Sequence, residues 1–181
     1  MPTIFNADVV VVGAGTSGSY FAWRLAGAGH RVLVLEKRAL NELGQHIDIF
    51  HMDAVRFAEF GIPLPEGDEV EHLAHSGLMW SPDLQVSHEI HYPFYVMHKP
   101  LFHRRLHSYV RDSGAEIVER ARVTGLLLHD GRLVGVHGEL DGKPFEARAP
   151  LVVDASGIKA EVRTRLPVSY THLRAHETKA N

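Results

Sequence analysis

DVVVVGAGTSGSYFAWRLAGAGHRVLVLE, residues 8–36, is the stretch that decides the fold of this 181-residue chain. Residues 8–12 form a short, continuously apolar and β-branched run, as expected of a parallel strand that is buried on both faces. Residues 18–28 are compatible with a helix, which Gly29 would end. Residues 31–36 predict a second buried strand. A strand, a glycine-rich turn, a helix and a strand within about thirty residues predict a βαβ unit with a right-handed crossover.

The turn after the first strand carries a G-x-G-x-x-G motif. Gly13 permits a tight turn, Gly15 lets the backbone approach a pyrophosphate, and Gly18 lets the helix pack closely on the strand. Free N–H groups and the positive end of the helix dipole attract phosphates. Glu36 ends the second strand, where it can accept hydrogen bonds from ribose hydroxyls. A purely structural turn is the alternative, but the surrounding elements favour a dinucleotide site formed by Gly13, Ala14, Gly15, Thr16, Ser17, Gly18 and Glu36.

The motif alone does not choose between FAD and a nicotinamide dinucleotide, because the same fingerprint serves both. Glu36 argues against NADP, since its carboxylate would face the 2′-phosphate. The adjacent cations Lys37 and Arg38 weaken that objection.

Composition excludes several classes of function. The net charge is -3 and no cluster of Lys and Arg stands out, so nucleic acid is not an expected partner. The absence of cysteine rules out disulfides, thiolate metal sites and a dithiol redox centre. No signal peptide and no apolar run of membrane-spanning length is evident, which predicts a cytoplasmic protein without a transmembrane segment. The oligomeric state is left open.

The rest of the chain predicts a longer α/β domain. Residues 53–60 suggest a short helix ending at Gly61, residues 63–67 suggest a loop, and residues 68–91 give no clear pattern. Residues 92–97 suggest a strand, and Pro100 suits the first position of a helix that ends at Gly114.

Two Asp-Gly pairs mark tight turns in the second half of the chain. Asp130-Gly131 and Asp141-Gly142 separate three expected strands, and the resulting β-meander leads into a short apolar strand followed by Ala155-Ser156-Gly157. The three meander strands are expected near residues 121–129, 132–140 and 143–149, and the short apolar strand at residues 151–154.

This order of elements, ending in LVVDASG at residues 151–157, resembles the FAD-binding half of the glutathione-reductase-like flavoprotein superfamily. The likeness is greatest to its geranylgeranyl reductase and aromatic hydroxylase type, over residues 7–38 and 92–167. It implies an α/β, Rossmann-like FAD/NAD(P)-binding domain with a parallel sheet, a β-meander and an incomplete substrate-domain excursion. The implied domain covers residues 1–167, with the βαβ unit at 7–36, the excursion at about 62–98, the helix and meander at 100–149 and a second cofactor strand at 151–157.

The resemblance also implies roles for single residues. Gly13 to Gly18 correspond to the pyrophosphate loop, and Glu36 with its neighbour Lys37 to the ribose site. Lys99, in K-x-x-F-x-x-x-L, stands where these families usually show an Arg near the cofactor, and Lys offers only a point charge there. The backbone of Val123 would meet the adenine edge. A second motif of small residues would pass close to the dinucleotide, unless it is a simple strand-ending turn; it comprises Asp154, Ala155, Ser156 and Gly157.

The activity that the resemblance implies is FAD-dependent oxidoreduction. Reduced nicotinamide, NAD(P)H, would deliver a hydride to the flavin, which would pass electrons to a small organic substrate or to dioxygen. No catalytic residue is assigned, because the flavin carries the redox chemistry. Two alternatives stay open: an inactive dinucleotide- or ADP-binding module, and an NAD-dependent dehydrogenase.

Three further segments are interpreted without a functional role. Residues 168–178, VSYTHLRAHET, resemble a translated sequencing adapter, so residues 168–181 are expected to be a non-native tail on a truncated chain. His103 and His107, four residues apart, are assigned to a solvated or partly buried helix face, and no metal site is predicted. A polar run that could approach the flavin is assigned instead to a loop or helix cap; it consists of His46, Asp48, His51 and Asp53.

Overall fold

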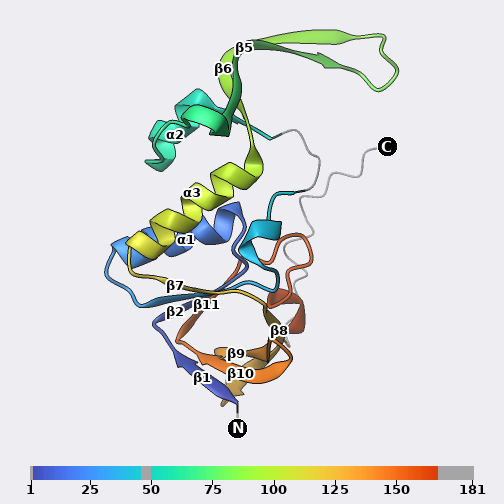
Figure 1. The fold of residues 1–181 in the computed structure, drawn as a ribbon. Coiled ribbons are helices and arrows are strands. Elements are labelled where there is room, and N and C mark those ends of the chain that lie inside the picture. The colour runs from blue at the N-terminus through green and yellow to red at the C-terminus, as the bar shows by residue number, and fades with distance from the viewer. Residues whose placement is uncertain (1, 46–49, 167–181) are drawn as a thin grey trace.

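The computed structural model describes residues 2–45 and 50–166, so the expected non-native tail, His46 and Asp48 lie outside the described residues. The main body has three layers (Figure 1). A four-stranded parallel sheet forms the middle layer, with helices α1 (Thr16–Gly27) and α3 (Lys99–Asp112) on one face. A second four-stranded sheet covers the other face. This arrangement confirms the predicted Rossmann-like α/β class.

The two central strands of the parallel sheet, β2 and β3, are apolar throughout. The order of the sheet is β11-β2-β3-β7, and Val9 of β2 lies opposite Val32 of β3 and Leu151 of β11. Val9 and Val11 pack towards the helices, whereas Val10 and Val12 pack towards the second sheet. Both faces are therefore buried, as a continuous apolar strand requires. The strands are β2 (Val9–Val12), β3 (Val32–Leu35), β7 (Glu116–Val118) and β11 (Leu151–Asp154).

The second sheet contains the predicted meander. Asp130 and Gly131 have φ values of 49° and 74°, and Asp141 and Gly142 have 49° and 76°. Tight two-residue hairpin turns need such positive φ values at both central residues. The sheet order is β1-β10-β9-β8, with β1 parallel to β10. The sequence did not predict β1, which is short and mostly exposed. The strands are β1 (Thr3–Asn6), β8 (Ala121–His129), β9 (Arg132–Leu140) and β10 (Lys143–Arg148).

The two long helices pack on each other as well as on the sheet. Pro100 lies in the first turn of α3, one position later than predicted, and Ala22 and Val110 belong to one buried cluster with the valines of the sheet. The rings of Trp23 and Tyr109 are 5.0 Å apart between the helices. Within the described ranges, no helix is long and apolar enough to cross a lipid bilayer.

A third, antiparallel sheet extends away from the main body (Figure 1). Its order is β4-β6-β5, and α2 follows β4 and ends at Gly61, whose φ of 63° permits the left-handed turn. The strand predicted at residues 92–97 is the second half of β6. The rest of the long β5–β6 hairpin was not predicted, because its side chains are largely exposed on both faces and show no alternation of polar and apolar residues. The elements are β4 (His51–Asp53), α2 (Ala54–Phe60), β5 (Val70–Trp80) and β6 (Ser87–Met97).

Replacing Leu106 by Ala tests the packing of α3. Leu106 is fully buried with Phe57 and Phe102, so its loss should lower the free energy of unfolding by about 2–5 kcal/mol. Leu64→Ala, at a position that is 51% exposed, is the matched control and should change it by less than about 0.5 kcal/mol. Urea denaturation of both variants measures the difference, and equal losses would contradict this account of the core.

Candidate dinucleotide-binding site

The three glycines of the motif each do a different structural job. Gly13 has a φ of 104°, and a side chain there would collide with the backbone of Ala155. A Cβ on Gly18 would overlap the carbonyl of Gly13, which explains the close approach of helix and loop. Around Gly15 there is open space instead. The loop is therefore tight at two glycines and accessible to a ligand at the third, as the motif predicts.

Glu36 fixes the loop from the neighbouring strand. Its side chain is only 6% exposed, Oε2 accepts the N–H of Ala14 at 2.8 Å, and Oε1 accepts the N–H of Arg38 at 3.0 Å. The N–H of Gly13 also donates to the carbonyl of Leu35 at 2.8 Å. Each carboxylate oxygen has two lone pairs, so Glu36 keeps acceptor capacity for a ribose hydroxyl.

Two histidines of α3 bind the loop from the other side, a role that sequence reasoning missed. His107 Nε2 lies 2.8 Å from the carbonyl oxygen of Ala14, and His103 Nε2 lies 3.0 Å from Thr16 Oγ1. A carbonyl only accepts, so the His107 ring carries its proton on Nε2. Both side chains are buried, which corrects the expectation of a solvated or partly buried helix face. The four-residue spacing of His103 and His107, which puts both rings on one face of a helix, was the sequence feature that could have indicated this shared role.

The carbonyl of Ala14 receives a second donor from α1. The Ser19 hydroxyl donates to it at 3.0 Å, beside His107. Burial lowers the pKa of His107 more than its bond to Ala14 raises it, so the imidazole is held neutral. Among residues 2–45 and 50–166, no group of three side chains is placed to hold a metal ion.

A pocket of about 380 Å³, here called the glycine-loop pocket, opens where the parallel strands end at the loop. It brings together most of the predicted site. Arg38, Arg122, Glu161 and Arg165 also line it and were not predicted. The predicted residues that line it are Gly13, Gly15, Glu36, Lys37, Val123, Ala155, Ser156 and Gly157.

Of the remaining predicted residues, Ala14 and Gly18 shape the loop from within, Thr16 binds His103, and Ser17 is exposed. Lys99 begins α3, where its ammonium group lies 5.6 Å from the Phe50 ring, outside the described lining of the glycine-loop pocket.

His51 and Asp53 lie in the third sheet rather than at the loop. The ring of His51 is 5.4 Å from that of Phe94, and Asp53 occupies the N-cap position of α2 without a capping hydrogen bond. Asp53 instead approaches Arg56 at 3.8 Å.

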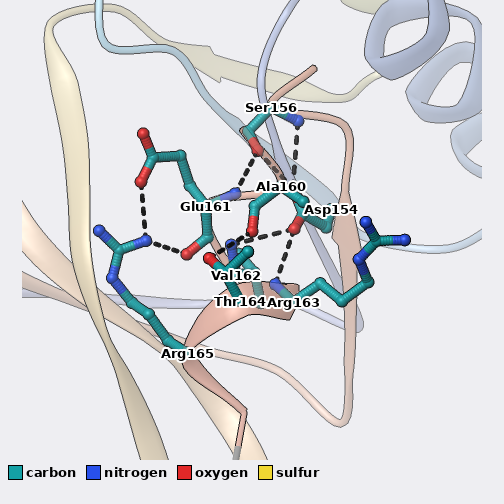
Figure 2. Close-up of polar contacts among 8 residues, drawn as sticks. All are labelled: Asp154, Ser156, Ala160, Glu161, Val162, Arg163, Thr164 and Arg165. Carbon is teal, nitrogen blue, oxygen red and sulfur yellow. Dashed lines mark hydrogen bonds and ion pairs between the residues drawn. The ribbon is translucent and has the colours of Figure 1, made fainter. Parts of the chain in front are cut away.

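Asp154 organises one wall of the pocket (Figure 2). Its Oδ2 accepts the N–H groups of Val162 at 3.0 Å and Arg163 at 2.8 Å, and its Oδ1 accepts the N–H and hydroxyl of Ser156. The Ser156 hydroxyl oxygen accepts the N–H of Glu161 at 2.7 Å, and Glu161 pairs with Arg165. Asp154 therefore holds the turn that carries Glu161 and Arg165, which goes beyond a simple strand-ending turn.

The electrostatic environment suits an anionic ligand. The pocket lining includes four cationic side chains and two acidic ones, a surplus of two positive charges. Its cations are Lys37, Arg38, Arg122 and Arg165, and its acids are Glu36 and Glu161. In addition, α1 begins at this loop, so the N–H groups of its first turn point to the same space. The site can therefore bind phosphates beside a sugar.

Comparison with known proteins agrees with this geometry. Residues 11–58 match the family model described as an NAD(P)-binding Rossmann-like domain. This chain has the Rossmann-like FAD/NAD(P)-binding fold. The digeranylgeranylglycerophospholipid reductase 1 of Methanopyrus kandleri is 35% identical over 159 residues, which cover 86% of this chain and 40% of that protein. The chain spans 36% to 40% of the length of the reductases of this name that it matches.

Solved structures share the fold. A geranylgeranyl bacteriochlorophyll reductase-like protein from Thermoplasma acidophilum superposes with a TM-score of 0.80 at 20% identity, over 92% of this chain and 43% of that one. A myxobacterial chondrochloren halogenase, of the FAD-dependent type, gives a TM-score of 0.69 at 23% identity, over 91% and 40%. The fold that the resemblance implied is thus confirmed, and the sequence relatives agree with its likeness to geranylgeranyl reductases.

Replacing Asp154 by Asn tests the wall of the pocket. The amide keeps only one acceptor oxygen, so at least one N–H of the 156–163 turn loses its acceptor. We therefore expect the free energy of unfolding to fall by about 1–3 kcal/mol. Asp112→Asn, at an exposed position near the end of α3, should have little effect. Thermal and urea unfolding compare the two, and a neutral Asp154→Asn would contradict the assigned role.

His107 should make stability depend on pH. Because its pKa in the folded state lies below the usual histidine value of 6.5, the unfolded chain binds the proton more tightly. The contribution to stability is therefore complete above 6.5 and is lost as the pH falls from there to the folded-state pKa. Urea midpoints measured across this range should fall less in His107→Gln, which keeps an N–H donor, than in the parent. His129→Gln, at a side chain that is 80% exposed, is the control, and identical slopes in all three would refute the assignment.

Proposed function

We propose that the glycine-loop pocket binds FAD and that the chain is the cofactor-binding part of a flavin-dependent oxidoreductase. The observation that carries this proposal is the rigid glycine loop, where Glu36 binds the N–H of Ala14 and both His107 and Ser19 bind its carbonyl. A preorganised loop needs little reordering to receive a diphosphate, which favours binding.

Each part of the pocket suits one part of the dinucleotide. Backbone N–H groups at Gly15 and the start of α1 would bind the pyrophosphate, and the surplus of cations would balance its charge. Glu36 would accept hydrogen bonds from the adenosine ribose. Val123 and Arg122 of β8 line the same pocket and would lie against the adenine. Small residues at Ala155 and Gly157 leave room for the remainder of the cofactor.

The bound flavin would accept a hydride from reduced nicotinamide and deliver electrons to an organic substrate or dioxygen. This chain's own residues would bind and orient the cofactor, and Glu36 and His107 would keep the loop in its binding shape. Reduction of an isoprenoid alkene is favoured over hydroxylation, because the relatives of 31% to 35% identity include several digeranylgeranylglycerophospholipid reductases. A small organic molecule, isoprenoid in part, is the proposed substrate class.

The proposal is tested by purifying the full chain in the presence of FAD and measuring the retained flavin absorption and the affinity. We expect Glu36→Gln to weaken FAD binding by roughly tenfold or more, since its amide cannot replace both acceptor oxygens. Glu71→Gln, at an exposed position on β5, is the matched control and should bind FAD like the parent.

The possible outcomes separate the alternatives. A folded chain with no affinity for any adenine dinucleotide would overturn the proposal. Binding of ADP without FAD would favour an inactive nucleotide-binding module. Displacement of FAD by NAD in direct competition would favour an NAD-dependent dehydrogenase.

A further inference from the structure

A second pocket lies beside the glycine-loop pocket. It measures about 430 Å³ and is here called the arginine pocket, after Arg104, Arg111 and Arg120 in its lining. Leu43, which follows the short turn η1 (Leu40–Glu42), lines both pockets and so separates them. A volume of this size accommodates part of a nucleotide or a comparable small molecule.

One face of α3 supplies the opposite wall. Pro100, Arg104, His107 and Arg111 recur at intervals of three and four residues, which places them in a single stripe along the helix. His107 is the buried member of this stripe and also binds the carbonyl of Ala14. The stripe therefore connects the arginine pocket directly to the glycine loop.

The lining of the arginine pocket holds three arginines and one acid, a surplus of two positive charges, although the chain as a whole carries a net charge of -3. Its acid, Glu119, accepts the N–H of Leu40 at 2.7 Å and so holds η1 in place. Arg120 forms a long ion pair with Asp141, at 3.9 Å, and both side chains are exposed on the surface. In the described part of the chain, Arg104 and Arg111 enter no ion pair, which leaves both guanidinium groups available to a ligand.

We propose that the arginine pocket binds the phosphate group of a second ligand while FAD occupies the glycine-loop pocket. Guanidinium groups are planar, permanently charged donors that bind phosphate oxygens in pairs. The 2′-phosphate of a nicotinamide dinucleotide is the favoured source, and this choice rests on the proposed flavoprotein function. Glu36 would repel a 2′-phosphate in the first pocket, whereas the arginine pocket presents three guanidinium groups beside a single carboxylate. A glycerophosphate headgroup is the other source of the same chemistry.

The test uses the full chain loaded with FAD and titrated calorimetrically with NADP⁺, with NAD⁺ and with glycerol phosphate. The oxidised nucleotides avoid turnover. We expect NADP⁺ to bind roughly tenfold tighter than NAD⁺, and the double variant Arg104→Gln/Arg111→Gln to abolish that difference without changing FAD retention. Arg132→Gln, at the exposed start of β9, is the matched control and should behave like the parent.

The outcomes distinguish this inference from the proposed function. If glycerol phosphate binds and the double variant loses it, the phosphate site stands and the headgroup is its source. If no phosphate-bearing probe binds more weakly to the double variant than to the parent, the inference is overturned, whatever the result for FAD.

Two complications have direct remedies. A chain that fails to retain FAD contradicts the proposed function, but the same titrations of parent and double variant without FAD still decide the arginine pocket, because Arg104 and Arg111 do not line the first pocket. If the double variant unfolds, the single variants are titrated separately, and each should weaken binding of the phosphate-bearing probe.

Discussion

The backbone of Ala14, between Gly13 and Gly15, is the constraint on which the site depends. The N–H of Ala14 donates to Glu36, and its carbonyl accepts from His107 and Ser19, so three elements hold one residue. A buried peptide that lost these partners would carry a large energetic penalty. The loop between β2 and α1 therefore has a single well-determined conformation, and the position of α3 is determined together with it.

This arrangement explains why a short strand, a loop and two helices form one unit. Glu36 at the end of β3, Ser19 of α1 and His107 of α3 all form hydrogen bonds with the same residue, Ala14. Apolar packing alone would let α3 slide along the valine-rich sheet, because such contacts have little directional preference. The hydrogen bonds of His107 to Ala14 and between His103 and Thr16 give the helix a fixed register. Directional bonds thus add specificity to a core whose stability comes mainly from burial.

The sequence predicted what depends on local patterns and missed what depends on distant partners. The βαβ unit and the meander were predictable because the glycine motif and the Asp-Gly turns are local. The strand β7 has only three residues, and β1 is defined by its pairing with β10, so neither leaves a local pattern. The same distinction holds in the site. Glu36 follows from its place at a strand end, whereas the bonds of His107 and Asp154 join residues that the sequence cannot place together without the fold.

The distribution of charge around the glycine loop suggests how one small domain can separate two anionic ligands. At the loop itself, backbone N–H groups and a buried acid lie side by side, which suits a diphosphate that carries an unmodified sugar. Beyond η1, arginines replace the acid as the dominant charges, which suits a free phosphate group. Both preferences meet at His107, whose ring touches the loop on one side and lines the arginine pocket on the other. The arginine pocket is therefore connected to the backbone of the glycine loop through one buried side chain.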